Sequence, residues 1–324
     1  MKKNYIISID FGGTKILSAL VNSKEGIIAR VKKSTKDAAT KAELAALLYE
    51  SIVELLDGNN VLETSVKSIC IGAPGSVDPF TGVIGLAPNL GFQNFNIKDA
   101  LQKFTDIPVL LENDVNLAAL GIANFDVAKD KQNVLVVFIG TGIGGGWILN
   151  GNIYRGNTYA AGEIGHMHVL DNGPICGCGN KGCFEAVASR SAMVRDIVKD
   201  IKSGKRSKLS KLVKAKAQIK SKSLYNAMAS ADPVTAFHVH KACAAIGKTL
   251  AGINNLMNLD MIVLGGGVIE AMKAFTVPII KTTFKQFSLK QSSKKTKIVV
   301  SKLLDDAALY GGIPLTKEFL NIEV

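Results

Sequence analysis

The sequence lacks an uninterrupted apolar run long enough to cross a membrane. Its longest apolar stretch, residues 134–149, is broken by five glycines, which is typical of buried strands and not of a membrane-spanning helix. The apolar run near the N-terminus is interrupted by Asp10 after five residues, and no small-residue cleavage site follows it. A secretory signal peptide is therefore not expected. We predict a cytoplasmic protein without a membrane partner.

Cysteine is scarce outside one segment. Three of the five cysteines and two of the four histidines fall in GEIGHMHVLDNGPICGCGNKGCFE, residues 162–185. The chain has no C-x-x-C pair, which argues against a thioredoxin-like redox site. In a reducing compartment, clustered cysteines bind metal more often than they form disulfides. A C-x-C-x4-C spacing can converge on one tetrahedral ion. The candidate ligands are Cys176, Cys178 and Cys183 with either His166 or His168, and chance clustering is the alternative.

Acidic residues are outnumbered, since 39 Lys and Arg face 27 Asp and Glu and give a net charge of +12. Most of this excess lies in residues 199–222, where ten Lys or Arg accompany one acid, Asp200, for a net +9. No aromatic platform or groove-reading motif accompanies the lysines, so we predict a solvated helical face and no nucleic-acid partner. The residues that follow helical spacing in this segment are Leu209, Leu212, Val213, Lys216 and Ile219.

Strand and helix patterns alternate along a chain that is 47% apolar, enough for a sizeable core and more than one domain. The series YIISID, FGGTK and ILSALV predicts a strand, a glycine turn and a second strand. NVLVVFIG, TGIGGG and WILNGN repeat this plan about 130 residues later. Further strands are expected at VKSICIG, PVLLEN, MIVLGGGV and KIVVS, with helices at 40–57, over most of 184–256 and at 305–320. This pattern predicts a mixed α/β protein with two lobes and a cleft between them.

Three glycine-rich turns are candidates for ligand binding, two of them for phosphate and the third, LGGGV, for the close approach of a flat or bulky ligand to the backbone. A P-loop is absent, and the G-x-G-x-x-G pattern at Gly140, Gly142 and Gly145 is followed by a strand pattern and not by the helix that a dinucleotide fold requires. Exposed backbone N–H groups in a tight turn can face phosphate oxygens, and a carboxylate can hold Mg²⁺ through water. Each turn taken alone also fits an ordinary hairpin. The first turn contains Asp10, Gly12, Gly13, Thr14 and Lys15, the second spans 140–144, and the third is LGGGV at 264–268.

The segment ENDVN joins a predicted strand to a predicted helix. Asn113 or Asp114 could simply cap the helix. An Asp beside an Asn at a strand end also suits a kinase, because the carboxylate can accept a proton from an attacking hydroxyl while the amide positions it.

Taken together, the motifs resemble those of the ROK family, which is named for repressors, open reading frames and sugar kinases. DFGGTK, IGAPG, APN, ENDVN, GTGIGGG, GEIGH and CGCGNKGCFE occur in the order found there, and the similarity is greatest to the bacterial glucokinase-like members. The resemblance implies an actin-like ATPase fold with two RNase H-like lobes around a central cleft and a zinc-binding loop. It places residues 1–116 and 305–324 in one lobe and residues 117–304 in the other. It also implies ATP, Mg²⁺ and structural Zn²⁺ as cofactors, and a homodimer.

The same resemblance assigns roles to individual positions. Asp114 matches the catalytic base, and the zinc ligands are His166 and the three clustered cysteines, which selects His166 over His168. Sugar contacts are implied for Gly75, Asn89, Asn113, Asp114, Glu163, His166 and Glu185. Nucleotide contacts are implied for Asp10, Gly12, Gly13, Thr14, Lys15, Gly140, Thr141, Gly142, Gly265, Gly266 and Gly267.

We therefore expect an ATP-dependent sugar kinase that converts glucose to glucose 6-phosphate. An N-acetylmannosamine or other N-acetylhexosamine kinase is the alternative within the enzymes, because those members share the Glu, His and Glu set. A sugar-responsive regulator is disfavoured, because the first phosphate turn begins at Asp10 and leaves no room ahead of it for a helix-turn-helix domain.

Overall fold

A computed structural model describes residues 4–87 and 91–324. By its internal contacts the chain groups into two compact units, unit 1 with residues 1–132, 146–161 and 305–324, and unit 2 with residues 133–145 and 162–304. These ranges differ from the predicted lobes in that residues 117–132 and 146–161 group with unit 1. The physical reason is that the helix following ENDVN packs against the C-terminal helix. The lobe boundaries themselves stay a prediction.

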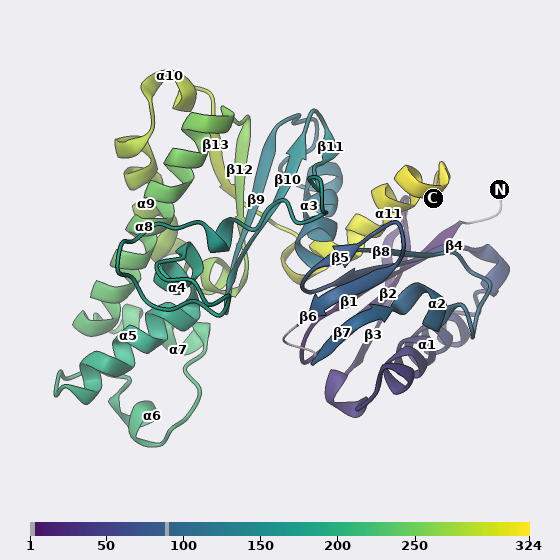
Figure 1. The fold of residues 1–324 in the computed structure, drawn as a ribbon, viewed down its shortest axis with the longest axis horizontal. Helices are drawn as coiled ribbons and strands as arrows, with labels where there is room; N and C mark the ends of the chain where they lie inside the picture. The colour runs from purple at the N-terminus through teal and green to yellow at the C-terminus, as the bar shows by residue number, and fades with distance from the viewer. Residues whose placement is uncertain (1–3, 88–90) are drawn as a thin grey trace. The chain divides into compact units, whose positions relative to one another are not determined.

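Unit 1 is built on a mixed five-stranded sheet with the order β3-β2-β1-β4-β8 (Figure 1). β1 pairs with β2 in antiparallel fashion and with β4 in parallel, and β4 pairs in parallel with β8. The strands are β1 (Tyr5–Phe11), β2 (Ile16–Asn22), β3 (Gly26–Lys33), β4 (Val66–Ala73) and β8 (Val109–Asn113), with a small sheet of β5 (Val77–Asp78), β6 (Val83–Ala87) and β7 (Phe92–Asn96). The helices are α1 (Lys41–Gly58), α2 (Ile97–Leu101), α3 (Asp114–Phe125) and α11 (Ala307–Leu320), and β10 (Ile143–Leu149) leads to the short β11 (Asn152–Ile153).

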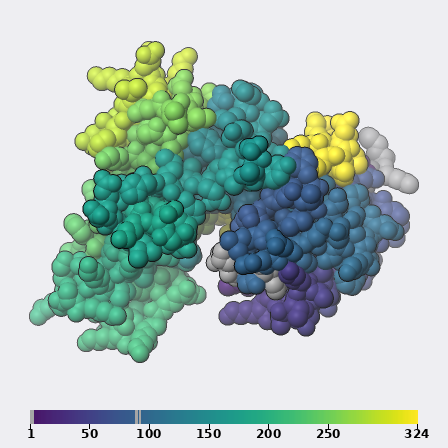
Figure 2. Space-filling model, viewed as in Figure 1, coloured from purple at the N-terminus to yellow at the C-terminus, as the bar shows by residue number. Residues whose placement is uncertain are grey.

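The alternation of side chains along β1 separates the two faces of this sheet. Ile7 and Ile9 enter the core that α1 covers, where they join Leu48. Ile6 points to the other face and packs with Leu309 of α11, and the Ser8 hydroxyl donates a hydrogen bond to the carbonyl of residue 308. Figure 1 shows α1 on one face of the sheet and α11 on the other, and Figure 2 shows α11, in yellow, on the surface of the unit that contains the N-terminal residues.

Helices α3 and α11 approach each other closely because glycine lies at the contact on both. A Cβ atom on Gly121 would lie 1.9 Å from the carbonyl oxygen of Ala307, and one on Gly311 would lie 1.8 Å from the carbonyl oxygen of Leu117. No side chain fits at such distances. The position of α3, whose first residue is Asp114, is therefore tied to the C-terminal helix.

Unit 2 repeats part of this plan. Its strand β12 pairs in parallel with β9 on one side and with β13 on the other, as β4 pairs with β1 and β8 in unit 1. The long helices α8 and α9 pack together beside these strands. The strands are β9 (Val134–Ile139), β12 (Met261–Gly265) and β13 (Lys297–Val300), and the helices are α4 (Phe184–Ala188), α5 (Arg190–Lys202), α6 (Ser210–Lys214), α7 (Ser221–Ala229), α8 (Pro233–Met257), α9 (Gly267–Phe287) and α10 (Lys290–Ser293).

The lysine-rich segment, residues 199–222, does not form one continuous helix. It includes the end of α5, the five-residue α6 and the start of α7. Beyond α6 the chain turns where Lys216 adopts a left-handed φ of 52°. Leu209 and Ile219 are buried, in agreement with the spacing of apolar residues. Figure 2 shows the segment, in green, at the periphery of its unit.

Within residues 4–87 and 91–324, no helix combines the length and the apolar character that a membrane crossing requires.

The close contact between α3 and α11 predicts a strong effect of a single methyl group. Gly311→Ala should lower the free energy of unfolding by about 1–3 kcal/mol, because the added carbon meets the backbone of α3. Gly252→Ala is the control, since Gly252 lies exposed within α8 and a Cβ there meets no atom within 4 Å. This control should be neutral or stabilising by up to about 1 kcal/mol. Urea unfolding of both variants measures the difference, and equal stabilities would contradict the packing argument.

Candidate functional site

The junction of β8 and α3 is a tightly bonded corner. Asn113 is the N-cap of α3: its side-chain oxygen accepts hydrogen bonds from the backbone N–H groups of Val115 (2.9 Å) and Asn116 (3.1 Å). Asp114 is the first helical residue, and its carboxylate accepts from the N–H of Val115 at 2.8 Å. The carboxylate therefore lies at the N-terminus of a helix, where the macrodipole favours negative charge. Of the two capping candidates, the structure selects Asn113.

Gly75 joins the same corner. The side-chain amide of Asn113 donates to the carbonyl oxygen of Gly75 at 3.3 Å. Gly75 has a φ of 87°, and a Cβ there would lie 2.1 Å from the carbonyl oxygen of Leu86, so only glycine fits. Two residues predicted to contact the sugar are thus adjacent in unit 1. Asn89, a third, lies outside the described residues.

The first glycine turn closes the β1–β2 hairpin. The N–H of Gly12 donates to the carbonyl of Lys15 at 2.9 Å, and the ammonium group of Lys15 forms an ion pair with Asp305 at 3.0 Å. Burial raises the pKa of Asp10 to about 6, against the opposing charge of Lys15, and the negative charge of Asp305 adds to the rise. A carboxylate in this setting is stabilised in its charged form when a cation binds.

In unit 2 the second and third glycine turns are neighbours. They follow β9 and β12, which are paired so that Gly265 lies opposite Phe138. Gly266 has a φ of 85°, and a Cβ there would lie 2.7 Å from the carbonyl oxygen of Ile139. Gly267 begins α9 directly afterwards. The parallel strands therefore bring both turns to one edge, at the start of a helix.

Glu185 is fastened to the second turn. Its carboxylate accepts from the N–H of Ile143 at 2.8 Å, and a Cβ on Gly142 would lie 2.1 Å from the same oxygen. Across the turn, the guanidinium of Arg190 donates to the Thr141 hydroxyl and, at 3.4 Å, to the Ser221 hydroxyl. The turn is therefore held from two sides.

A cavity of about 470 Å³ opens beside Thr141. Its wall is partly apolar and partly cationic, and three lysines of the lysine-rich segment line it. The three lysines are exposed, as predicted, and Lys202 and Lys214 lie on helices, but Lys216 lies beyond the end of α6. The lining residues include Arg190, Val194, Val198, Lys202, Lys214 and Lys216.

The four predicted zinc ligands converge on one point in unit 2. The ligand atoms of His166, Cys176, Cys178 and Cys183 all lie within 4.8 Å of one another. The sulfurs of Cys178 and Cys183 are 3.7 Å apart, and the Cys176 sulfur is 3.6 Å from Nδ1 of His166. Tetrahedral zinc with bonds of about 2.3 Å to sulfur requires spacings of about 3.8 Å, so this donor set fits the ion. Zinc itself stays a prediction.

The two histidines of GEIGHMH are now distinguished. The second ring nitrogen of His166, Nε2, lies 3.7 Å from the carboxylate of Glu163. His168 instead bonds the carbonyl of Lys181 and the carboxylate of Asp171, each at 3.0 Å. Its ring nitrogens are therefore engaged away from the cysteines, which agrees with the choice of His166.

Comparison with known proteins establishes the family. The ROK family model matches residues 6–318, and a glucokinase of Halalkalibacterium halodurans is 31% identical over 98% of this chain and 96% of its own length. The chain belongs to the ROK family. The structure of a ROK family glucokinase from Streptomyces griseus in complex with glucose and AMPPNP has a TM-score of 0.82, with 26% identity over 97% of this chain and all of that one. A ROK family transcriptional regulator, a homologue of the E. coli MLC protein, has a TM-score of 0.85, with 26% identity over 97% of this chain and 78% of that one.

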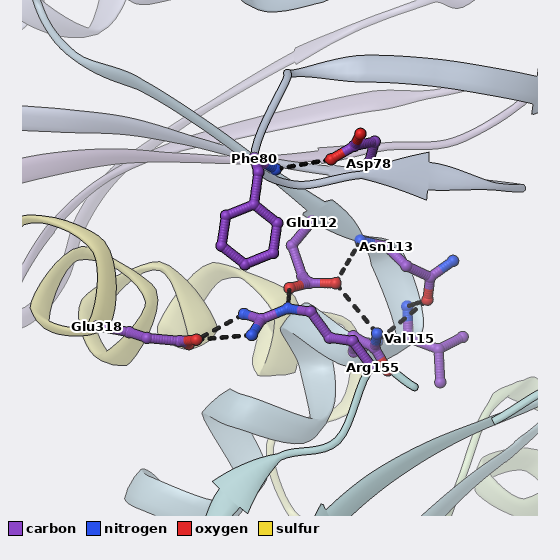
Figure 3. Close-up of polar contacts among 8 residues, drawn as sticks. Asp78, Phe80, Glu112, Asn113, Val115, Arg155 and Glu318 are labelled. Carbon is purple, nitrogen blue, oxygen red and sulfur yellow. Dashed lines mark hydrogen bonds and ion pairs between the residues drawn. The ribbon is translucent and has the colours of Figure 1, made fainter. Parts of the chain in front are cut away.

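This ROK protein also contains a polar cluster that the sequence patterns did not reveal. Glu112 is 2% exposed and bonds the guanidinium of Arg155 at 2.6 Å. Arg155 in turn forms two hydrogen bonds to Glu318 of α11, at 2.6 and 2.9 Å. Burial opposes the charge of Arg155, but the hydrogen bonds and charges of both glutamates raise its pKa above the ordinary value. Figure 3 shows Glu112 between Arg155 and the backbone of Asn113.

An acidic residue at the end of an apolar strand, VLLEN, was the available signal for Glu112. No local sequence pattern predicts the pairing of Glu112, because Arg155 and Glu318 lie 43 and 206 positions further along the chain. Sequence patterns of helical or strand period do not report such pairings.

The buried carboxylate of Asp10 predicts a pH-dependent stability. Its folded pKa of about 6 exceeds the ordinary value of 3.8, so its favourable contribution to folding is complete below about pH 3.8 and is lost as pH rises through about 6. Asp10→Asn should therefore become more stable than wild type by about 3 kcal/mol near pH 7.5, and this gap should shrink by about 2 kcal/mol near pH 4.5. Urea unfolding without nucleotide or divalent cation measures both gaps. A gap that is independent of pH would contradict the assignment.

Proposed function

We propose that this ROK protein is an ATP-dependent hexose kinase that converts glucose to glucose 6-phosphate. Two kinds of observation support the proposal: glucokinase relatives of similar length, at 31% and 30% identity, and the fold of a ROK glucokinase with bound glucose and AMPPNP. The observation that carries it is the corner at β8 and α3, where Asp114 lies at a helix N-terminus beside a capping asparagine and the carbonyl of Gly75.

In this proposal Asp114 accepts the proton of the attacking sugar hydroxyl. A general base must be ionised and fixed in direction, and the N–H of Val115 together with the helix dipole favours both. The sugar contacts of this proposal are Asn113, Asn89 and the backbone at Gly75, together with Glu163, His166 and Glu185. Carboxylates, an amide and an imidazole discriminate between epimers, because a misplaced hydroxyl leaves a buried polar group unpaired.

The donor ATP is assigned to the glycine turns. We propose that Gly12 to Lys15 and Gly140 to Gly142 face its phosphates, and that Gly265 to Gly267 face the nucleoside. The neighbouring cavity of about 470 Å³ is large enough for part of a nucleotide, and its valines and lysines suit a base and phosphates respectively. Mg²⁺, held through water by Asp10, would neutralise phosphate charge.

The zinc cluster has a structural role in this proposal. Glu163 comes three residues before His166, and Glu185 comes two residues after Cys183. A closed four-ligand site would fix the separation of these two sugar-reading carboxylates. An actin-like two-lobed architecture and a homodimer are part of the same proposal, and both come from the family resemblance.

A substrate panel tests the function directly. ATP consumption should be measured with glucose, mannose, fructose, N-acetylmannosamine and N-acetylglucosamine in turn. Turnover with glucose is expected. Turnover restricted to the acetylated sugars would replace the proposal with an N-acetylhexosamine kinase, and no sugar-dependent turnover at all would favour a regulator.

Asp114→Asn should lower kcat by about 10²- to 10⁴-fold and leave glucose affinity largely intact, because the general base is lost while the shape is kept. Calorimetry with glucose measures the binding. Asp99→Asn is the control, since Asp99 is an exposed first-turn residue of α2 in the same unit. Wild-type turnover in Asp114→Asn would remove Asp114 from the mechanism.

Cys178→Ser should reduce bound zinc from about one ion per chain and weaken glucose binding at the same time. Cys70→Ser is the matched control, because Cys70 is buried among Ser68, Thr316 and the carbonyl of Gly312, where a hydroxyl finds partners. Metal content by elemental analysis and calorimetry with glucose provide the two readouts. Unchanged sugar binding in zinc-free protein would show that the metal does not support the sugar site.

A further inference from the structure

The carboxylate of Glu112 is buried, and both of its oxygens accept hydrogen bonds. One oxygen accepts from Nε of Arg155 at 2.6 Å. The other accepts from the backbone N–H of Asn113 at 2.9 Å and from the side-chain amide of Asn116 at 3.0 Å. Glu112 is therefore hydrogen-bonded to two residues at the start of α3, Asn113 and Asn116, which lie on either side of Asp114 in the chain.

Arg155 is the cation paired with this carboxylate, and it is itself fixed on its other edge. Its side chain is 10% exposed, and both terminal nitrogens bond the carboxylate of Glu318. The ring of Phe319 lies 5.5 Å from its central carbon, which adds a cation–π contact. Figure 3 shows the guanidinium spanning the two glutamates.

Removal of Arg155 would change the structure at the junction of β8 and α3. A buried carboxylate that loses its cation must find water, shift or become neutral. Glu112 can shift only by releasing Asn113 or Asn116, because its second oxygen bonds both. Asn113 is the cap that sets the start of α3, so such a shift would move Asp114 as well.

We propose that Arg155 is a positioning residue for the phosphoryl transfer: through Glu112 it fixes the direction of the Asp114 carboxylate, and through Glu318 it makes that direction depend on the C-terminal helix. This inference rests on the proposed function, in which Asp114 is the base. Displacement of a reacting group by about 1 Å can cost about 100-fold in rate.

The planar fork of arginine is essential to this arrangement. Nε serves Glu112 while the two terminal nitrogens serve Glu318, so one rigid plane joins two carboxylates from different segments. A lysine keeps the charge but offers a single point donor. Arg155→Lys is therefore the informative substitution, because it retains the charge that Glu112 needs and loses the geometry.

Arg30→Lys is the matched control. Arg30 also forms a two-nitrogen pair with a carboxylate in this unit, Asp306, at 3.3 and 2.7 Å, directly before α11. Within the part of the chain that the structure describes, the hydrogen-bond partner of Arg30 is Asp306 and not a residue of the β8–α3 corner. Arg155→Lys should lower kcat with glucose by about 10- to 100-fold and change the KM for ATP by less than about threefold. Arg30→Lys should stay within about twofold of wild type in both.

A double-mutant comparison separates positioning from general damage. If Arg155 acts through Asp114, then adding Arg155→Lys to Asp114→Asn should lower the residual kcat by less than about twofold. A further tenfold loss in that background, or equal kcat values for Arg155→Lys and Arg30→Lys, would overturn the inference and leave the proposed function intact. Wild-type turnover in Asp114→Asn, or no sugar-dependent turnover in wild type, would overturn both.

Glu318→Gln keeps the test available if Arg155→Lys does not fold. Glu318 is 40% exposed, so its replacement loosens Arg155 from outside without breaking the buried pair. We expect a fall in kcat of about two- to fivefold that disappears in the Asp114→Asn background. An unchanged kcat in Glu318→Gln would then contradict the proposal.

Discussion

The close contact of α3 with α11 is the constraint on which the rest of unit 1 depends. Glycine on both helices lets their backbones approach to a distance that excludes any side chain, and α11 packs on β1, β2 and β4 as well. The helix that begins at Asp114 is therefore placed by the last helix of the chain. The Glu112–Arg155–Glu318 cluster acts between the same elements, because it joins the start of α3 to α11 through buried charge. Packing sets the distance between the helices, and the ionic cluster sets the orientation of the corner.

In unit 2 the proposed site residues are positioned by groups that lie close to them in the sequence. Four possible metal ligands within eighteen residues meet at one point, and the carboxylates of Glu163 and Glu185 lie at the two ends of that stretch. Glu185 is in turn fastened to the second glycine turn through the N–H of Ile143. A residue proposed to read the sugar is thus hydrogen-bonded to a turn proposed to hold the donor phosphates, which would let occupation of one affect the other.

Much of the architecture could be predicted where the signal is local. The apolar runs YIISID and VKSICIG are strands, and the helix expected at 40–57 is α1, capped by Thr40 and Glu43. The spacing of three cysteines within eight residues pointed to a common ion, because so short a segment keeps the three sulfur atoms close enough to bind one tetrahedral metal. The short strands β5, β6 and β7 were not predicted, since strands of two to five residues carry little periodic signal. Helix was expected over most of residues 184–256, and the turn at Lys216 is one of the places where the helical structure of the lysine-rich segment is interrupted.

The sequence by itself determined the family, the order of strands and helices, and the residue types available for phosphate, sugar and metal. These follow from motifs whose members are near one another in the chain. The family resemblance had already favoured His166 over His168, and the tertiary structure decided which of Asn113 and Asp114 caps α3 and which cation neutralises Glu112. The cap depends on the orientation of one side chain within four residues, whereas the pairing of Glu112 joins segments that are 43 and 206 positions apart in the chain. Backbone approach and buried charge pairing select among such contacts, and neither leaves a periodic pattern in the chain.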